Sequence, residues 1–73
     1  MKIVRFSKEI YDLLYLESAI LAYKKIATID VEHDELNWNC RFTDCEFDEE
    51  KTASEFGNYV IDLMNSKKIN DCN

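Results

Sequence analysis

Proline is absent from this 73-residue chain, and glycine occurs only once, at position 57. Loops and linkers are usually rich in these two residues, so their scarcity predicts long regular elements joined by tight turns. A chain of this length has interior for a single hydrophobic core. We therefore predict one domain over residues 1–73, with an ordered core over residues 2–68 and a polar tail over residues 69–73.

Long apolar segments are missing as well. No run of apolar residues approaches the roughly 18 that a membrane-spanning helix needs. The segment from Met1 to Arg5 begins like a strand and not like a secretory segment. The three cysteines are an odd number, which fits reduced thiols better than a disulfide framework. We therefore expect a cytoplasmic protein without a membrane partner.

Basic residues are scarce in the middle of the chain. The formal net charge is −6, and nine acids lie between positions 30 and 50 with Arg41 as the only Lys or Arg among them. Such a surface repels the phosphate backbone, so we expect no nucleic-acid binding. It would attract a basic protein or peptide, although acids on a small protein also serve simply to keep it soluble.

The first half of the chain predicts a strand followed by a helix. Residues 2–6 are rich in β-branched and aromatic side chains, which favour a strand. A helix is predicted from an N-cap at Asp12 to Lys24 and Lys25, because apolar residues recur along it at steps of three and four. Its predicted buried face comprises Leu13, Leu16, Ile20 and Tyr23, widened by Leu14 and Leu21.

Two further strands are predicted over residues 27–32 and 36–42, with a tight turn at residues 33–35. In the later strand the apolar side chains of Leu36, Trp38, Cys40 and Phe42 alternate with those of Asn37, Asn39 and Arg41. Strict alternation is typical of an antiparallel strand with one buried and one solvated face. We expect the apolar set to enter the core and the polar set to face water.

A last helix is predicted to begin at Asp48 and to end near Lys67 and Lys68. Its predicted buried face comprises Ala53, Phe56, Val60 and Leu63, with Met64 beside them. Gly57 lies inside this helix, where glycine costs about 1 kcal/mol relative to alanine. We therefore predict that Gly57 allows a close approach to Ala19 and Ala22 of the first helix.

The resulting order is β-α-β-β-α. A right-handed crossover makes the first and second strands parallel, and the third strand then fits between them. We predict an α+β, two-layer sandwich with a three-stranded, mostly antiparallel sheet and two helices on one face. Its predicted core joins Trp38, Phe42, Ile20, Phe56 and Val60.

The candidates for a metal or catalytic site are weak. Structural zinc needs paired ligands at short spacing, whereas Cys40 and Cys45 form one imperfect pair whose first member is expected in the core. The acids of residues 44–55 resemble a calcium loop, but Glu49 stands where that loop requires glycine. His33 has no Cys or Ser partner that the predicted fold would bring near. We predict no enzyme, no metal and no cofactor.

Recognition of another protein or peptide is therefore the predicted function. An extended peptide can add to the edge of a small sheet through main-chain hydrogen bonds. Asn37, Asn39 and Arg41 on the solvated face are suited to holding its polar groups, although each of them singly is also an ordinary surface residue. The surface around Asn58 and Tyr59 on the last helix is the second candidate.

Several residues also form a recognisable set: Phe6, Ile10-Tyr11, residues 19–23 (Ala-Ile-Leu-Ala-Tyr), Ile29-x-Val31 and Phe56-Gly57-Asn58. On these residues the chain resembles the small D protein of the His-Xaa-Ser systems, which are associated with a pair of radical S-adenosylmethionine enzymes. The resemblance implies an accessory role in peptide maturation, in which the chain presents a peptide to the enzyme. It assigns no catalytic residue.

Two other functions stay open. In the first, the chain is a scaffold or precursor peptide, and its own tail over residues 67–73, which contains Cys72, is modified. In the second it is an acidic inhibitor of the kind that phage encode, and it occupies a basic groove on its target. The sequence does not fix the oligomeric state.

Overall fold

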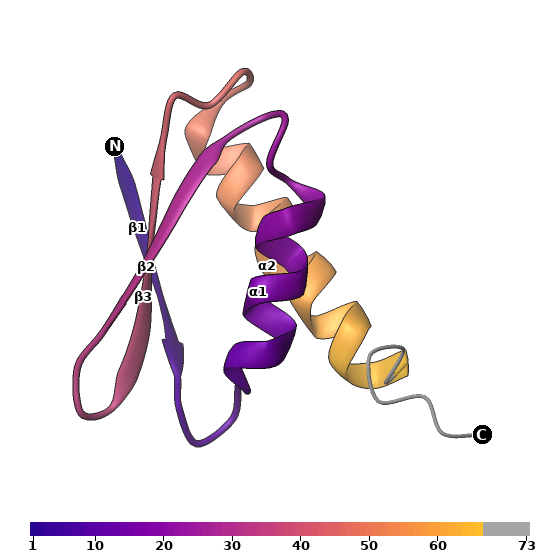
Figure 1. Cartoon of the computed structure of the whole chain (residues 1–73). Coiled ribbons are helices and arrows are strands. Elements are labelled where there is room, and N and C mark those ends of the chain that lie inside the picture. The colour runs from indigo at the N-terminus through magenta and orange to yellow at the C-terminus, as the bar shows by residue number, and fades with distance from the viewer. Residues whose placement is uncertain (67–73) are drawn as a thin grey trace.

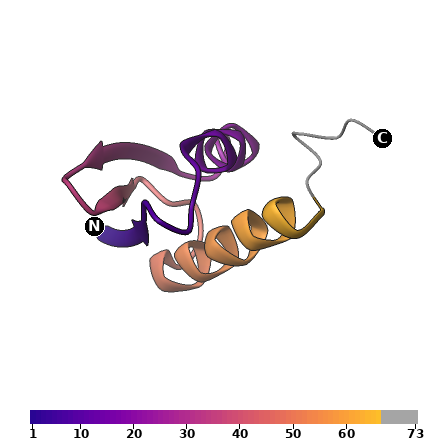
Figure 2. The ribbon, with the colours of Figure 1, turned by 90° about the horizontal axis from the view of Figure 1, so that it is seen from below.

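The computed structural model describes residues 1–66, which fold into five elements in the order β-α-β-β-α. They are β1 (Lys2–Ser7), α1 (Leu13–Ala22), β2 (Thr28–His33), β3 (Asn37–Thr43) and α2 (Glu49–Ser66). The sheet forms one layer, and both helices lie on the same side of it (Figures 1 and 2). The predicted α+β class and two-layer arrangement are confirmed.

The sheet has the strand order β1-β3-β2, and β3 is antiparallel to both neighbours. β1 and β2 therefore run in the same direction with β3 between them, as predicted. Cys40 lies opposite Val4 on one side and Val31 on the other. Because side chains alternate along each strand, this row of three faces the helices, and the next row along faces away from them.

Phe56 of α2 is the centre of the core. Its ring meets those of Phe42, Tyr23 and Phe6 edge to face, with centroid distances of 5.2, 5.5 and 6.0 Å. Phe42 and Phe56 are both fully buried, and burying one such side chain stabilises the fold by about 1.5–3 kcal/mol. The aromatic contacts therefore join the sheet to both helices.

The predicted core set is only partly enclosed. Phe42, Phe56 and Val60 are fully buried, whereas Trp38 and Ile20 are partly buried and pack against the core from its margin. The Trp38 indole N–H donates to the carbonyl of Tyr11 at 3.0 Å, which holds the ring at the end of the sheet. A tryptophan in this position buries its apolar body and satisfies its one donor.

Three leucines that were expected in the core lie outside it. Leu14, Leu21 and Leu36 are 43%, 71% and 71% exposed. Positions 14 and 21 lie about 140–160° around the helix from the buried Leu16, because each residue turns an α-helix by about 100°. Leu36 belongs to the loop before β3. The prediction of burial from apolar character alone is therefore wrong for these three side chains.

Two element boundaries also differ from the predictions. α1 ends at Ala22, so Lys24 and Lys25 lie in the turns that follow and not in its last helical turn. The hairpin turn occupies residues 34–36, since His33 still belongs to β2. Asp34 fixes this turn: its Oδ1 accepts the N–H groups of Leu36 and Asn37, both at 2.8 Å.

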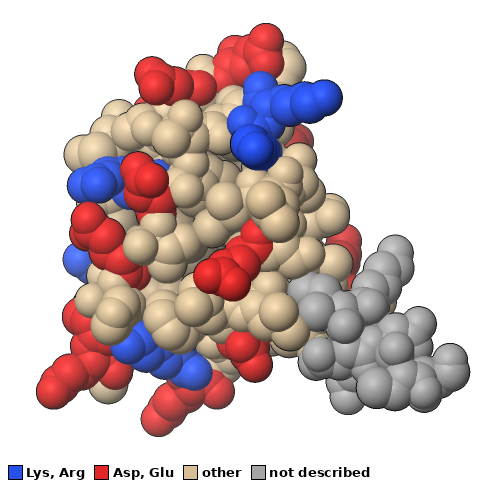
Figure 3. All heavy atoms as spheres, in the orientation of Figure 1, with Lys and Arg blue, Asp and Glu red and all other residues tan. Residues whose placement is uncertain are grey.

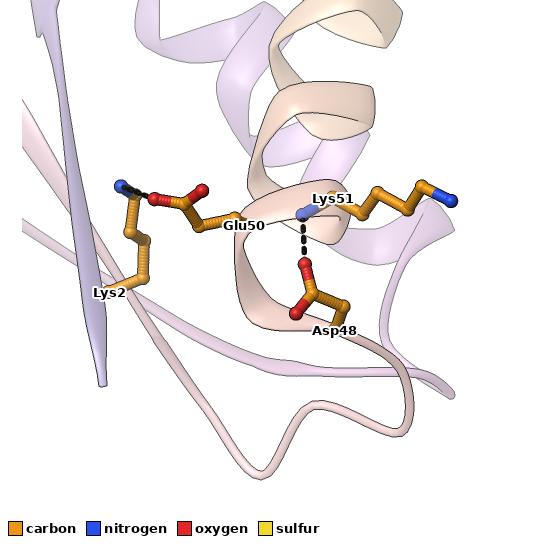
Figure 4. Close-up of polar contacts among 4 residues, drawn as sticks. All are labelled: Lys2, Asp48, Glu50 and Lys51. Atoms are coloured by element: carbon orange, nitrogen blue, oxygen red, sulfur yellow. Dashed lines mark hydrogen bonds and ion pairs between the residues drawn. The ribbon is translucent and has the colours of Figure 1, made fainter.

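The helix starts agree with the predictions. Asp12 caps α1 by accepting the N–H of Leu14 at 3.0 Å, and Asp48 caps α2 by accepting the N–H of Lys51 at 2.9 Å (Figure 4). The predicted end of the last helix at Lys67 and Lys68 lies outside the described residues.

The predicted close contact at Gly57 is wrong. Apart from the backbone of its own helix turn and its chain neighbours, no atom of residues 1–66 lies within 4 Å of the place where a Cβ on Gly57 would stand. The helices meet instead through Tyr23, the C-cap of α1, whose ring contacts those of Phe56 and Tyr59. Large aromatic side chains thus hold the helices together, so a backbone approach at Gly57 is unnecessary.

Candidate protein-binding surfaces

The sheet face opposite the helices carries the three polar residues that the alternation singled out. Asn37, Asn39 and Arg41 follow one another along β3, the central strand, while Cys40 and Phe42 point into the core. Opposite Asn39 lie Arg5 of β1 and Glu32 of β2. We call the side of the sheet that faces away from the helices the open face.

Two of these polar side chains already have partners within the chain. Nη2 of Arg41 lies 3.4 Å from Oε2 of Glu32, and Nδ2 of Asn39 donates to Oδ2 of Asp34 at 3.3 Å. Exposed ion pairs of this kind contribute about 0–1 kcal/mol. The Arg41 guanidinium is therefore able to exchange Glu32 for another carboxylate at small cost.

The carbonyl oxygen of the Asn39 side chain is in a different position. It is shielded from water and has no hydrogen-bond donor among residues 1–66. Rotating the amide would place this oxygen against the Asp34 carboxylate, so the orientation with Nδ2 toward Asp34 is the favourable one. An acceptor left in this state costs about 1–3 kcal/mol. Because the oxygen is shielded, a partner's donor would reach it only after the Asn39 side chain rotates away from Asp34.

Asn58 and Tyr59 lie on α2, in the layer that covers the other side of the sheet. The structure therefore does not bring them together with the polar residues of β3. The Tyr59 ring, 36% exposed, meets that of Tyr23 with centroids 5.7 Å apart. Burial, followed by the Glu55 charge, raises the pKa of Tyr23. Tyr23 and Tyr59 therefore lie at the outer margin of the core.

Cys40 and Cys45 are free thiols, and Nδ1 of His33 lies 3.1 Å from the Lys8 ammonium. Burial raises the pKa of Cys40 to about 11, and desolvation followed by the Glu49 charge raises that of Cys45. Residues 1–66 contain no group of three or more His, Cys, Asp or Glu placed to hold a metal ion. Cys72 lies outside the described residues. No helix within residues 1–66 is long and apolar enough to cross a membrane.

Sequence reasoning missed a hollow beside β2. It measures about 380 Å³ and lies between α1 and the strand, lined by Glu17, Ile20, Leu21 and Val31. The space-filling view shows an uncharged area among scattered acidic and basic groups on the side where α1 lies in front (Figure 3). The position of Leu21, far around the helix from Leu16, was the available signal that part of α1 stays uncovered.

The two edges of the sheet differ. Near β1 two ion pairs bridge the space toward α2. The Met1 ammonium lies 3.0 Å from Glu49, and Lys2 lies 3.4 Å from Glu50 (Figure 4). β2 is bordered by the apolar hollow instead, and its outer side pairs with no strand in residues 1–66. β2 is therefore the more accessible edge.

Comparison with known proteins adds no relative. No protein-family model matches the chain, and no curated protein and no solved structure matches it either.

Proposed function

We propose that this chain is a protein-binding module that holds an extended peptide segment of a partner against its three-stranded sheet. The observation that carries the proposal is the open face, on which Asn37, Asn39 and Arg41 line the central strand while both helices cover the other side. Amide and guanidinium groups at every second residue match the spacing of polar groups along an extended peptide.

The polar groups of the open face are suited to exchanging partners. Asn39 donates to Asp34 at 3.3 Å, and Arg41 lies in an exposed ion pair with Glu32 at 3.4 Å. Binding would therefore exchange these two contacts for contacts with the partner at small cost, because the contacts given up are exposed and weak.

The charge of the chain favours a basic partner. The net charge is −6, and the acids Asp30, Glu32 and Asp34 are exposed beside the open face. Arg5 and Arg41 lie within that face, so its centre is mixed and its β2 side is acidic. An acidic border speeds the encounter with a basic segment and orients it.

The resemblance to the small D protein of the His-Xaa-Ser systems supports a particular partner. We propose that the module is an accessory protein in peptide maturation and that it presents a peptide to a radical S-adenosylmethionine enzyme. The bound segment is then the peptide substrate or a segment of the enzyme itself.

Site-specific photo-crosslinking in cells tests the binding function. A benzoylphenylalanine at position 37 reports on the open face, and the same group at the exposed position 54 of α2 is the matched control. We expect position 37 to crosslink to one protein that position 54 does not capture. Crosslinks from position 58 alone would move the binding surface to α2, and crosslinks from none of these positions would contradict the proposal.

A further inference from the structure

We infer that the free edge of β2, together with the hollow beside it, receives an extended partner segment in which apolar residues alternate with lysine or arginine. This inference rests on the proposed binding function, but it names a surface and an occupant that recognition through the open face does not require.

The main chain of β2 is arranged to accept another strand. The Asp34 N–H donates to the carbonyl of Asn37, directly opposite in the hairpin, at 3.0 Å. Bonded pairs in an antiparallel ladder recur at every second residue, so Asp30 and Glu32 turn their main-chain groups toward β3. Ile29, Val31 and His33 therefore turn their N–H and C=O groups toward the free edge. An incoming strand would bond to these three residues.

The side chains on either side of this edge set the alternation of the occupant. Successive side chains of an added strand point to opposite faces of the sheet. Those on the helix side meet the hollow lined by Ile20, Leu21 and Val31, which favours apolar groups. Those on the other side lie beside Asp30 and Glu32, which are both exposed and favour cations.

The net charge beside the free edge of β2 stays negative after the neighbouring cations are counted. Glu17 borders the hollow as a third acid, and the exposed Asp34 follows the strand as a fourth. Two cations offset part of this charge: Arg41 pairs with Glu32, and the Lys8 ammonium lies 3.1 Å from Nδ1 of His33. The edge therefore stays acidic, and it complements a basic strand.

A second copy of the chain is a poor occupant. Two β2 strands paired antiparallel would place Asp30 and Glu32 of both copies on one face, where like charges in opposite positions are destabilising. The β1 edge carries Lys2, which points toward the helix side and is tied to Glu50. Such a charge at an edge discourages further pairing. The acids of β2 thus repel another copy and attract a basic strand.

Selection from a displayed library of short random peptides, with the full chain as bait, tests the inference. We expect the enriched peptides to alternate apolar residues with lysine or arginine. In the bound state hydrogen exchange should slow at the amides of Ile29, Val31 and His33, whereas the amides of Asp30 and Glu32 should change little because they already bond to β3.

Three variants locate the binding. Leu21→Lys places a charge on the hollow at an exposed position, and we expect affinity to fall about tenfold. Asp30→Lys should weaken basic peptides about threefold and strengthen their glutamate-substituted analogues. Ile61→Lys on α2, at a side chain that is 41% exposed, is the matched control and should bind normally.

Several outcomes would overturn the inference: no enriched peptide, enriched peptides without the alternation, unchanged affinity in Leu21→Lys, or dimers in sedimentation that this substitution dissociates. The proposed function is tested separately with the crosslinked partner. A partner that binds Leu21→Lys and Asp30→Lys normally, but fails to bind a chain altered on the open face, leaves the proposed function standing and removes this edge from it.

Discussion

Asp34 closes the hairpin by accepting the backbone N–H of Asn37 on its Oδ1 at a distance of 2.8 Å. The bonds to Leu36, Asn37 and Asn39 lower the pKa of this carboxyl below its ordinary value of 3.8. Hydrogen bonds to a carboxylate favour its charged form.

We expect this group to make stability depend on pH under acidic conditions. Because its folded pKa is lower than its unfolded pKa, the contribution is complete above the unfolded value near 3.8 and is lost as the pH falls through the lower, folded value. Urea unfolding at a series of acidic pH values measures it. Asp34→Asn keeps an oxygen for the turn but cannot ionise, so its curve should be flatter in this range; an identical slope would mean that Asp34 is not responsible.

Gly57→Ala should stabilise the chain. The added Cβ meets open space, and alanine is a better helix former than glycine by about 1 kcal/mol. Alanine also restricts the unfolded chain, which acts in the same direction. Thermal and urea unfolding measure the change, and Ser54→Gly in the same helix is the control, expected to destabilise by about 0.5 kcal/mol. A less stable Gly57→Ala would reveal a contact that helix propensity does not describe.

Cys40 should react slowly with thiol reagents while the chain is folded. Its side chain is fully buried, and with a pKa of about 11 only about one molecule in a thousand carries the thiolate at pH 8. Labelling kinetics in a chain with Cys45→Ser and Cys72→Ser isolate this thiol. The rate should rise steeply in denaturant, and fast labelling without denaturant would mean that the core opens readily around β3.

A chain in which Asn37, Asn39 and Arg41 are all replaced by alanine should bind the crosslinked partner about tenfold more weakly. Its free energy of unfolding should not fall, because the lost contacts are exposed and the unpaired Asn39 oxygen, which costs about 1–3 kcal/mol, is removed with them. Isothermal titration gives the affinity and urea unfolding gives the stability. Asn58→Ala on α2 is the control, since it lies in the other layer.

Salt provides an independent check on the same complex. If acids steer the encounter, the association rate should fall as ionic strength rises past about 0.15 M, where the screening length is roughly 8 Å. Stopped-flow mixing measures this rate. An affinity that neither the triple replacement nor salt alters would contradict binding through the open face.

The sequence predicts where helices and strands form better than it predicts which of their side chains are covered by the rest of the chain. Alternation along β3 correctly predicts that Cys40 and Phe42 are buried, and the caps at Asp12 and Asp48 mark both helix starts. These features depend on neighbouring residues alone. Leu21 shows the limit: its apolar character suggests burial, but exposure depends on which side of α1 the rest of the chain covers.

The same distinction between local patterns and long-range contacts applies to the candidate binding surfaces. Alternation identifies the polar residues of β3, since it needs only the period of a strand. The unpaired oxygen of Asn39 and the hollow beside β2 depend on residues brought together from distant parts of the chain, such as Ile20 and Val31. No local pattern contains that information.

Because β3 is the central strand, it also determines when the sheet can begin to fold. Lys2 of β1 pairs with Phe42 of β3, and β1 and β2 do not pair with each other. The sheet therefore cannot start to form before β3 leaves the ribosome. A nascent chain that ends before β3 has a helix and two unpaired strands. Contacts between segments so distant in sequence slow folding, because a long loop must close before they form. Newly made chains therefore expose apolar strand residues until β3 arrives, and mutations in β3 should affect soluble yield more than equally buried mutations in α1.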